Sequence, residues 1–122
     1  MLQGNFFTVS QLAMEPGSIK ALLEIDPTHA IFEGHFPDAP VVPGVCMIQM
    51  VKEMIEQMAG AEIRLLRADH IKFLSVIDPR VEKTIWLEAN YTMTEDKKIS
   101  VTASIRQHAV ICFKFKGLFL AP

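Results

Sequence analysis

The chain has 122 residues, of which half are hydrophobic and 21% are charged. This size and composition predict a single domain over residues 1–122 with one packed core. Twelve basic and 14 acidic residues give a formal charge of −2, so no broad positive field forms and a nucleic-acid partner is not expected. The apolar runs are shorter than the roughly 20 residues that span a bilayer, and the first residues resemble no secretion signal. We therefore expect a cytoplasmic protein that does not enter a membrane.

The first half of the chain predicts two strands, an irregular loop and a helix. Residues 6–15 and 18–26 form the strands, joined by a turn at Pro16-Gly17. Four prolines interrupt regular pairing between residues 26 and 43. A helix then begins at Pro43-Gly44 and continues to Ala59, before Gly60. Apolar side chains recur along it at three- and four-residue intervals over most of its circumference, which predicts a buried helix.

The second half of the chain predicts four further strands, over residues 63–76, 83–93, 97–107 and 110–120. Apolar and polar residues alternate along residues 84–93 and again along 99–105, as in strands with one buried face. One apolar helix and six antiparallel strands bury each other only if the sheet curves around the helix. We therefore expect an α+β fold, a meander of six strands wrapped around one long central helix.

Two observations concern partners and cofactors. Cys46 and Cys112 lie far apart without CxxC spacing, so both are expected to be reduced and buried, and neither a disulfide nor a metal site is expected. The mean hydropathy of +0.25 is high for a small monomer, which predicts an apolar surface covered by a second subunit.

The segment that joins the irregular loop to the helix start contains the motif that most clearly indicates function. Residues 34–45 have the sequence GHFPDAPVVPGV. This segment resembles the GHFPxxPVxPGV signature of the β-hydroxyacyl-acyl-carrier-protein dehydratases of the bacterial fatty-acid synthesis type. Residues 6–25 resemble the opening hairpin of that family, and residues 71–79 resemble its later strand and turn. The resemblance implies the hot-dog fold, one helix wrapped by a sheet, and an obligatory dimer, without a cofactor.

The resemblance also implies roles for individual residues. His35 occupies the position of the base that removes the α-proton, and an imidazole with a pKa near 6.5 suits that task. The N–H groups of Gly44 and Val45, at the positive end of the helix dipole, are expected to bind the thioester carbonyl. Phe36 and Phe73 are expected to line the acyl tunnel. The other histidines (His29, His70 and His108) are expected to be structural.

The position of the family's acid, fourteen residues after the base, is occupied by Gln49. Glutamine has no proton to release near neutral pH. Glu53 follows four residues later on the same helix face, so it is a candidate for the missing carboxyl, against the alternative of a surface glutamate paired with Lys52 or Gln57. The expected catalytic set is therefore His35, Gln49 and Glu53.

The sequence thus predicts a dehydratase that removes water from a 3-hydroxyacyl thioester carried on acyl carrier protein, in fatty-acid or related acyl-chain synthesis. In relatives the base and the acid of one site come from different subunits, which implies a homodimer with two composite sites. A dimer of dimers and a heterodimer remain open. So do two other functions: a non-catalytic acyl-thioester-binding or partner subunit, and a hot-dog thioesterase.

Overall fold

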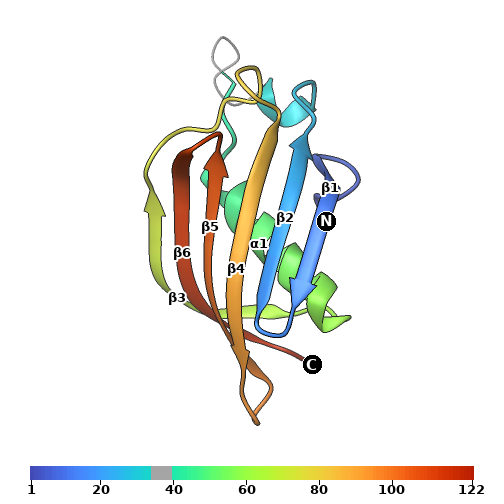
Figure 1. Ribbon diagram of the computed structural model, residues 1–122, viewed down its shortest axis with the longest axis vertical. Helices are drawn as coiled ribbons and strands as arrows, with labels where there is room; N and C mark the ends of the chain where they lie inside the picture. Colours follow the sequence, from blue (N-terminus) through green and yellow to red (C-terminus); the bar gives the residue numbers. More distant parts are fainter. Residues whose placement is uncertain (34–39) are drawn as a thin grey trace.

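The computed structural model describes residues 1–33 and 40–122, which form one helix and six strands around a shared core (Figure 1). The helix spans the predicted residues, and the strands begin or end within three residues of the predicted bounds. The elements in chain order are β1 (Phe7–Glu15), β2 (Ser18–Ile25), the 3-10 turn η1 (Ala30–Phe32), α1 (Gly44–Ala59), β3 (Arg64–Phe73), β4 (Thr84–Met93), β5 (Lys98–Gln107) and β6 (Val110–Leu120).

The six strands form one antiparallel sheet in the order β1-β2-β4-β5-β6-β3. This order differs from the predicted meander, because β3 pairs with β6 at the far edge and not with β4. The helix and the connection after it carry the chain from β2 across one face of the sheet, so β3 starts at the opposite edge (Figure 1). Residues 74–83 then return the chain to β4 beside β2.

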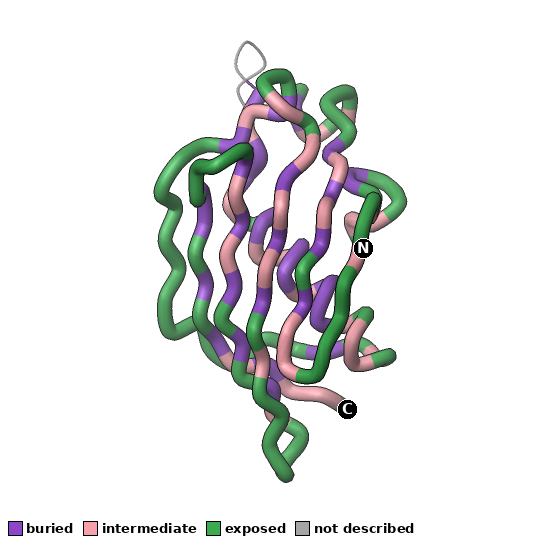
Figure 2. The backbone as a smooth tube through the Cα atoms, in the orientation of Figure 1, coloured by how far each residue is buried: buried purple, intermediate pink, exposed green. Residues whose placement is uncertain are grey.

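The core lies between α1 and the concave face of the sheet. Along β4 and β5, buried and more exposed side chains alternate, so that one face of each strand points at the helix (Figure 2). The helix contributes Met50, Val51, Met54 and Ile55, all at most 1% exposed. Gly60 ends the helix in the left-handed conformation with φ of 68°, where glycine carries no steric penalty. The curved sheet wrapped around one helix is the hot-dog fold that the sequence predicted.

Strand β3 differs from the other strands because all ten of its residues are exposed (Figure 2). It is an edge strand that pairs with β6 on one side, so within the described residues its outer side presents backbone donors and acceptors without a partner strand. Several exposed apolar side chains accompany it, including Leu66, Ile71 and Phe73. This edge is therefore the surface of the described chain that most resembles an uncovered interface.

The structure confirms the prediction for the two cysteines, since Cys46 and Cys112 are both free and buried. Within the part of the chain that the structure describes, no helix has the length and apolar character needed to cross a membrane.

Candidate functional site

The first turn of α1 presents two backbone donors. Pro43 precedes the helix in an extended conformation, and its carbonyl accepts hydrogen bonds from the N–H groups of Cys46 (3.0 Å) and Met47 (3.3 Å). The N–H groups of Gly44 and Val45 have no acceptor among the described residues. Donors at a helix N-terminus carry partial positive charge. The side chain of Val45 is 73% exposed, so this turn faces outward, and its two donors are suited to bind an oxygen that carries negative charge.

An aromatic ring lies directly over this turn. A Cβ atom added at Gly44 would be 2.6 Å from Cζ of Phe73, a distance that real Cβ atoms do not tolerate. A larger residue at this position would therefore displace the ring, which comes from the end of edge strand β3. Phe73 packs against Phe113 with ring centroids 5.4 Å apart, yet remains 55% exposed. The structure thus brings together three of the predicted site residues, Gly44, Val45 and Phe73.

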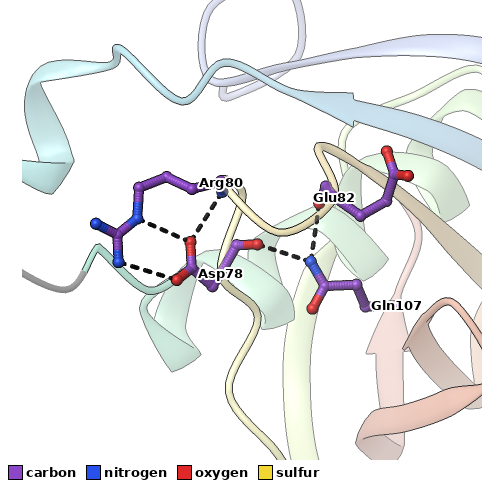
Figure 3. A network of polar contacts seen from close by, with 4 residues as sticks. All are labelled: Asp78, Arg80, Glu82 and Gln107. Atoms are coloured by element: carbon purple, nitrogen blue, oxygen red, sulfur yellow. Dashed lines mark hydrogen bonds and ion pairs between the residues drawn. The ribbon is translucent and has the colours of Figure 1, made fainter.

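The segment that enters the helix is held by the connection between β3 and β4. The N–H of Val42 donates to the carbonyl of Ile77 at 2.9 Å, and both side chains are buried. The buried side chain of Gln107 in turn donates from Nε2 to the carbonyl oxygens of Asp78 and Glu82, both at 2.8 Å (Figure 3). The end of β5 therefore fixes residues 78–82, and these fix the approach to the helix start.

A charged pair stabilises the same connection. The carboxylate of Asp78 accepts hydrogen bonds from the guanidinium of Arg80 at 3.1 and 3.2 Å and from the backbone N–H of Arg80 at 2.8 Å (Figure 3). These bonds, first of all those from the guanidinium, lower the pKa of Asp78 below its usual value. The turn at Asp78-Pro79-Arg80 is thus held by an ionised carboxylate.

Between two and three turns further along α1, Glu53 lies almost fully buried, with 1% of its surface exposed. Its Oε2 accepts from the N–H of Leu2 at 2.8 Å and from Nε2 of Gln49 at 3.0 Å, and its Oε1 accepts from the N–H of Gln3 at 2.8 Å. Both carboxylate oxygens therefore have hydrogen-bond partners within the protein. The alternative of a surface glutamate paired with Lys52 or Gln57 does not hold.

The structure joins Gln49 and Glu53, as their spacing predicted, but adds a partner that the sequence did not indicate. The residues near the N-terminus lie against the helix, and their backbone amides bind Glu53. Backbone amides have no sequence signature, so no motif could have revealed this contact. The half-buried Gln49 donates one N–H to Glu53, which orients its amide and leaves its carbonyl oxygen and second N–H for another partner.

The catalytic base predicted from the motif, His35, and the predicted tunnel residue Phe36 lie outside the described residues. Of the other histidines, His29 has the structural role expected for it. Its Nδ1 accepts from the N–H of Ile31 at 3.0 Å, which caps η1, and its Nε2 donates to the side-chain oxygen of Asn5. The loop between β2 and the helix is thereby tied to the N-terminal segment.

Two further observations limit the chemistry near the helix start. Burial raises the pKa of the Cys46 thiol, so this side chain is a neutral thiol at pH 7 and not a thiolate nucleophile. Across residues 1–33 and 40–122, no three His, Cys, Asp or Glu side chains converge as metal ligands would. The described part of the site therefore consists of backbone donors, an amide, a buried carboxylate and an aromatic ring.

Residues 11–114 match the model of a protein family described as ApeI-like, ApeI dehydratase. This match covers most of the chain. The protein belongs to the ApeI-like dehydratase family. The resemblance found in the sequence, to dehydratases with a hot-dog fold, is thereby confirmed at the level of the family.

Curated relatives of this ApeI-like protein carry the name 3-hydroxyacyl-[acyl-carrier-protein] dehydratase FabZ. One from Protochlamydia amoebophila is 30% identical over 81 residues, which cover 58% of this chain and 50% of the relative. Another from Rickettsia felis is 24% identical over 109 residues, which cover 83% of this chain and 75% of the relative. The chain spans about half the length of the first of these relatives.

Solved structures agree on the fold. The dehydratase heterocomplex ApeI:P from Xenorhabdus doucetiae contains a chain with a TM-score of 0.73 and 20% identity, and the match covers 92% of this chain and 96% of that one. A hypothetical thioesterase from Streptococcus pneumoniae, solved with coenzyme A, has a TM-score of 0.69 and 8% identity, with 95% and 85% covered. At these identities the likeness establishes the hot-dog fold of the ApeI-like protein.

Proposed function

We propose that the protein is a hydro-lyase that removes water from a 3-hydroxyacyl thioester carried on acyl carrier protein, giving a trans-2-enoyl thioester in the cytoplasm. Three observations support this proposal: membership of a dehydratase family, the motif around His35, and two N–H donors at the first turn of α1 that have no acceptor among the described residues. The N–H groups of Gly44 and Val45 give the proposal its main structural support. An enolate oxygen is the group that such donors stabilise as the α-proton leaves.

In the proposed reaction the thioester carbonyl binds to the N–H groups of Gly44 and Val45. Neutral His35 removes the α-proton, and the electron pair of the broken C–H bond moves into the enolate held by these donors. The double bond then forms between the α- and β-carbons as the C–O bond to the β-hydroxyl breaks. Phe36 and Phe73 border the acyl chain, for which the half-exposed ring of Phe73 beside Gly44 provides an apolar wall.

The departing hydroxyl needs one proton to leave as water. Gln49 cannot supply it but can hold the hydroxyl through the amide atoms that Glu53 leaves free. Glu53 has both oxygens engaged with N–H donors, which favours a positioning role behind Gln49 over that of proton donor. Within the chain, the imidazolium formed at His35 is then the proposed source of the proton.

We further propose that two copies associate through the exposed edge strand β3. Its unpaired backbone groups and apolar side chains would continue the sheet across a two-fold axis, as an antiparallel pair allows. Each site would then combine residues of two subunits. A heterodimer uses the same edge, so the mass of the purified particle distinguishes the two assemblies.

The experiment is an assay of the purified protein with 3-hydroxyacyl-acyl carrier protein as substrate. It measures the rate at which the enoyl product forms and, in the reverse direction, the rate at which that product is hydrated. The His35→Ala variant should lose about 10²–10⁴-fold in rate, whereas His108→Ala, an exposed histidine near the β5–β6 turn, should keep full activity. Release of free thiol in the same assay would instead reveal a thioesterase. A protein without dehydration or hydration at any pH would refute the proposal.

A second function, that of partner subunit in a dehydratase heterodimer, is favoured by one specific observation. The acid position holds Gln49, and the nearby Glu53 is already engaged by N–H donors. A second hot-dog subunit with a carboxyl at the corresponding position would complete the site. This function predicts that the chain alone is inactive and becomes active after assembly with such a subunit, while the same subunit paired with the His35→Ala variant stays inactive.

A further inference from the structure

The face of the sheet that points away from α1 has a hollow of about 410 Å³ over strands β3, β6, β5 and β4. Its lining is rich in basic side chains, and these are exposed although the neighbouring residues on β6, Phe113 and Phe115, point into the core. The polar residues that line the hollow are His70, Lys72, Lys114, Lys116, Glu88, Asn90, Thr102 and Ser104.

The strand register places four of the basic groups next to one another. Lys72 of β3 lies directly opposite Lys114 of β6, and His70 lies opposite Lys116. Side chains directly opposite are about 5 Å apart, and those two residues along a strand are about 7 Å apart. The four residues therefore stand at the corners of a rectangle of about 5 by 7 Å, and three ammonium groups and one imidazole extend from it.

Hydroxyl groups adjoin the basic groups on the next strand. In β5, Ser104 is the register partner of Lys114, and Thr102 is the register partner of Lys116. Both line the hollow. The surface thus combines point charges with neutral hydrogen-bond donors, the combination that binds phosphoryl oxygens in proteins.

The positive charge of the hollow is not neutralised by the described chain. The other two strand lysines, Lys20 and Lys98, have carboxylate partners at 3.9 and 3.2 Å. No ion pair of Lys72, Lys114 or Lys116 occurs within residues 1–33 and 40–122. The one carboxylate in the lining, Glu88, is engaged by Lys20 and by Arg106 at 3.4 Å.

Like charges directly opposite on neighbouring strands are destabilising. The arrangement of Lys72 beside Lys114 therefore costs stability in the free protein and is relieved when an anion binds between them. We propose that this hollow binds a small phosphate-bearing molecule, with Lys72, Lys114 and Lys116 as its charge partners and Ser104 and Thr102 as donors. The compact spacing and the concave shape favour a small anion over the broad surface of an acidic protein. This site lies on the face opposite Gly44 and does not depend on the proposed dehydration.

The test is calorimetric titration of the whole protein with inorganic pyrophosphate at low ionic strength, with thermal unfolding in parallel. Lys114→Gln and Lys116→Gln should each weaken the affinity roughly tenfold, because each removes a charge-assisted hydrogen bond. Lys52→Gln, which removes the same charge from α1, should bind as the wild type does. Without ligand, Lys114→Gln should unfold at a higher temperature than the wild type, which also shows that the variant is folded.

The proposal is overturned if pyrophosphate gives no saturable binding, or if Lys114→Gln and Lys116→Gln bind it as tightly as the wild type. Vesicles of phosphatidylglycerol in phosphatidylcholine distinguish a lipid headgroup from a soluble phosphate. Binding to these vesicles without binding to pyrophosphate would overturn the assignment to a small molecule. None of these outcomes depends on catalytic activity, so the site and the proposed dehydratase function stand or fall separately.

Discussion

Two neighbouring parts of one helix have opposite states of hydrogen bonding. At the first turn of α1, the N–H groups of Gly44 and Val45 have no acceptor among the described residues, and the adjacent ring of Phe73 is half-exposed. Between two and three turns later, both oxygens of Glu53 accept hydrogen bonds in a buried environment. Within residues 1–33 and 40–122, a ligand bound by these two N–H groups displaces no hydrogen bond. At the second place a reaction must first displace a structural contact, so the charged residue is the less available of the two.

The largest expected effect comes from introducing an acid that can release a proton beside Glu53. In the Gln49→Glu variant, a new carboxyl replaces an amide that now lies 3.0 Å from Glu53. Two carboxylates so close cannot both ionise at ordinary pH, so the pair retains one proton with a raised apparent pKa. We expect dehydration to accelerate by about 10²–10⁴-fold, measured in the acyl carrier protein assay.

The matched control is Gln57→Glu, an exposed position of the same helix, which should leave the rate unchanged. The gain in the Gln49→Glu variant should decline as the pH rises and the shared proton is lost. A slower Gln49→Glu enzyme would mean instead that the amide of Gln49 itself is needed for the reaction.

The next effect tests whether Glu53 is structural. Glu53→Gln keeps the shape but replaces one acceptor oxygen by an amide group that faces the N–H of Leu2 or Gln3. The free energy of unfolding should fall by about 2–4 kcal/mol, because charge-assisted bonds are lost and a buried donor is left unpaired. Denaturant unfolding measures this loss, and hydrogen exchange at Leu2 and Gln3 should accelerate.

Glu56→Gln serves as the comparison, since the half-buried Glu56 accepts one hydrogen bond from the described part of the chain, that of the Ile63 N–H at 2.9 Å. Its cost should be clearly smaller. Equal costs for the two variants would show that the contacts of Glu53 contribute nothing special to stability.

Alanine substitutions at two glycines, Gly44 in the first turn of α1 and Gly117 in β6, test how far the first turn tolerates change. The nearest atoms to a Cβ at Gly44 belong to the ring of Phe73, at 2.6 Å, and this ring is half-exposed and can turn away. A Cβ at Gly117 meets buried Phe115 at 2.5 Å and the backbone oxygen of Arg67 at 2.7 Å. Gly117→Ala should therefore cost about 1–3 kcal/mol in unfolding free energy, and Gly44→Ala less.

For activity the order should reverse, because Gly44→Ala displaces the ring beside the proposed carbonyl donors. The double variant Gly44→Ala with Phe73→Ala removes the clash and should recover stability relative to Gly44→Ala. A Gly44→Ala protein with wild-type kinetics would contradict the placement of Phe73 at the site.

Much of the fold could be predicted because its signals are local. The alternation along residues 84–93 and the Pro-Gly boundaries of α1 depend on neighbours in the sequence, and both gave the observed elements. The position of β3 could not be predicted in the same way. Whether an exposed strand pairs with β4 or β6 depends on how the helix and residues 74–83 cross the sheet, which no local pattern of residues encodes.

The candidate site shows the same division. The motif indicated Gly44 and Val45 correctly as the start of a helix, and spacing placed Gln49 beside Glu53. The sequence could not show that Glu53 is buried by Leu2 and Gln3, because that contact uses only their backbone amides. The role of His35, which lies outside the described residues, remains a prediction from the motif.

The smallest expected effect concerns the loop that holds the helix start. The bonds from Arg80 lower the pKa of Asp78 from its usual value of 3.8, so the folded carboxylate binds a proton more weakly than the unfolded one. Below this value the unfolded chain takes up the proton first, and stability falls as the pH drops through the folded pKa. Above it the contribution is fully present. Asp78→Asn should therefore lower stability slightly near neutral pH and flatten its fall at acidic pH, measured by urea unfolding across that range.

Arg80→Gln should remove most of the same pH dependence, since the guanidinium is the main cause of the lowered pKa. Because residues 78–82 support the bond between Val42 and Ile77, hydrogen exchange at Val42 should also accelerate in Asp78→Asn. The exchange at Leu2, which depends on Glu53, should not change. Acceleration at both amides would mean that the helix start and the Glu53 contacts open together. The first turn of α1 and the region around Glu53 would then not be independent of each other.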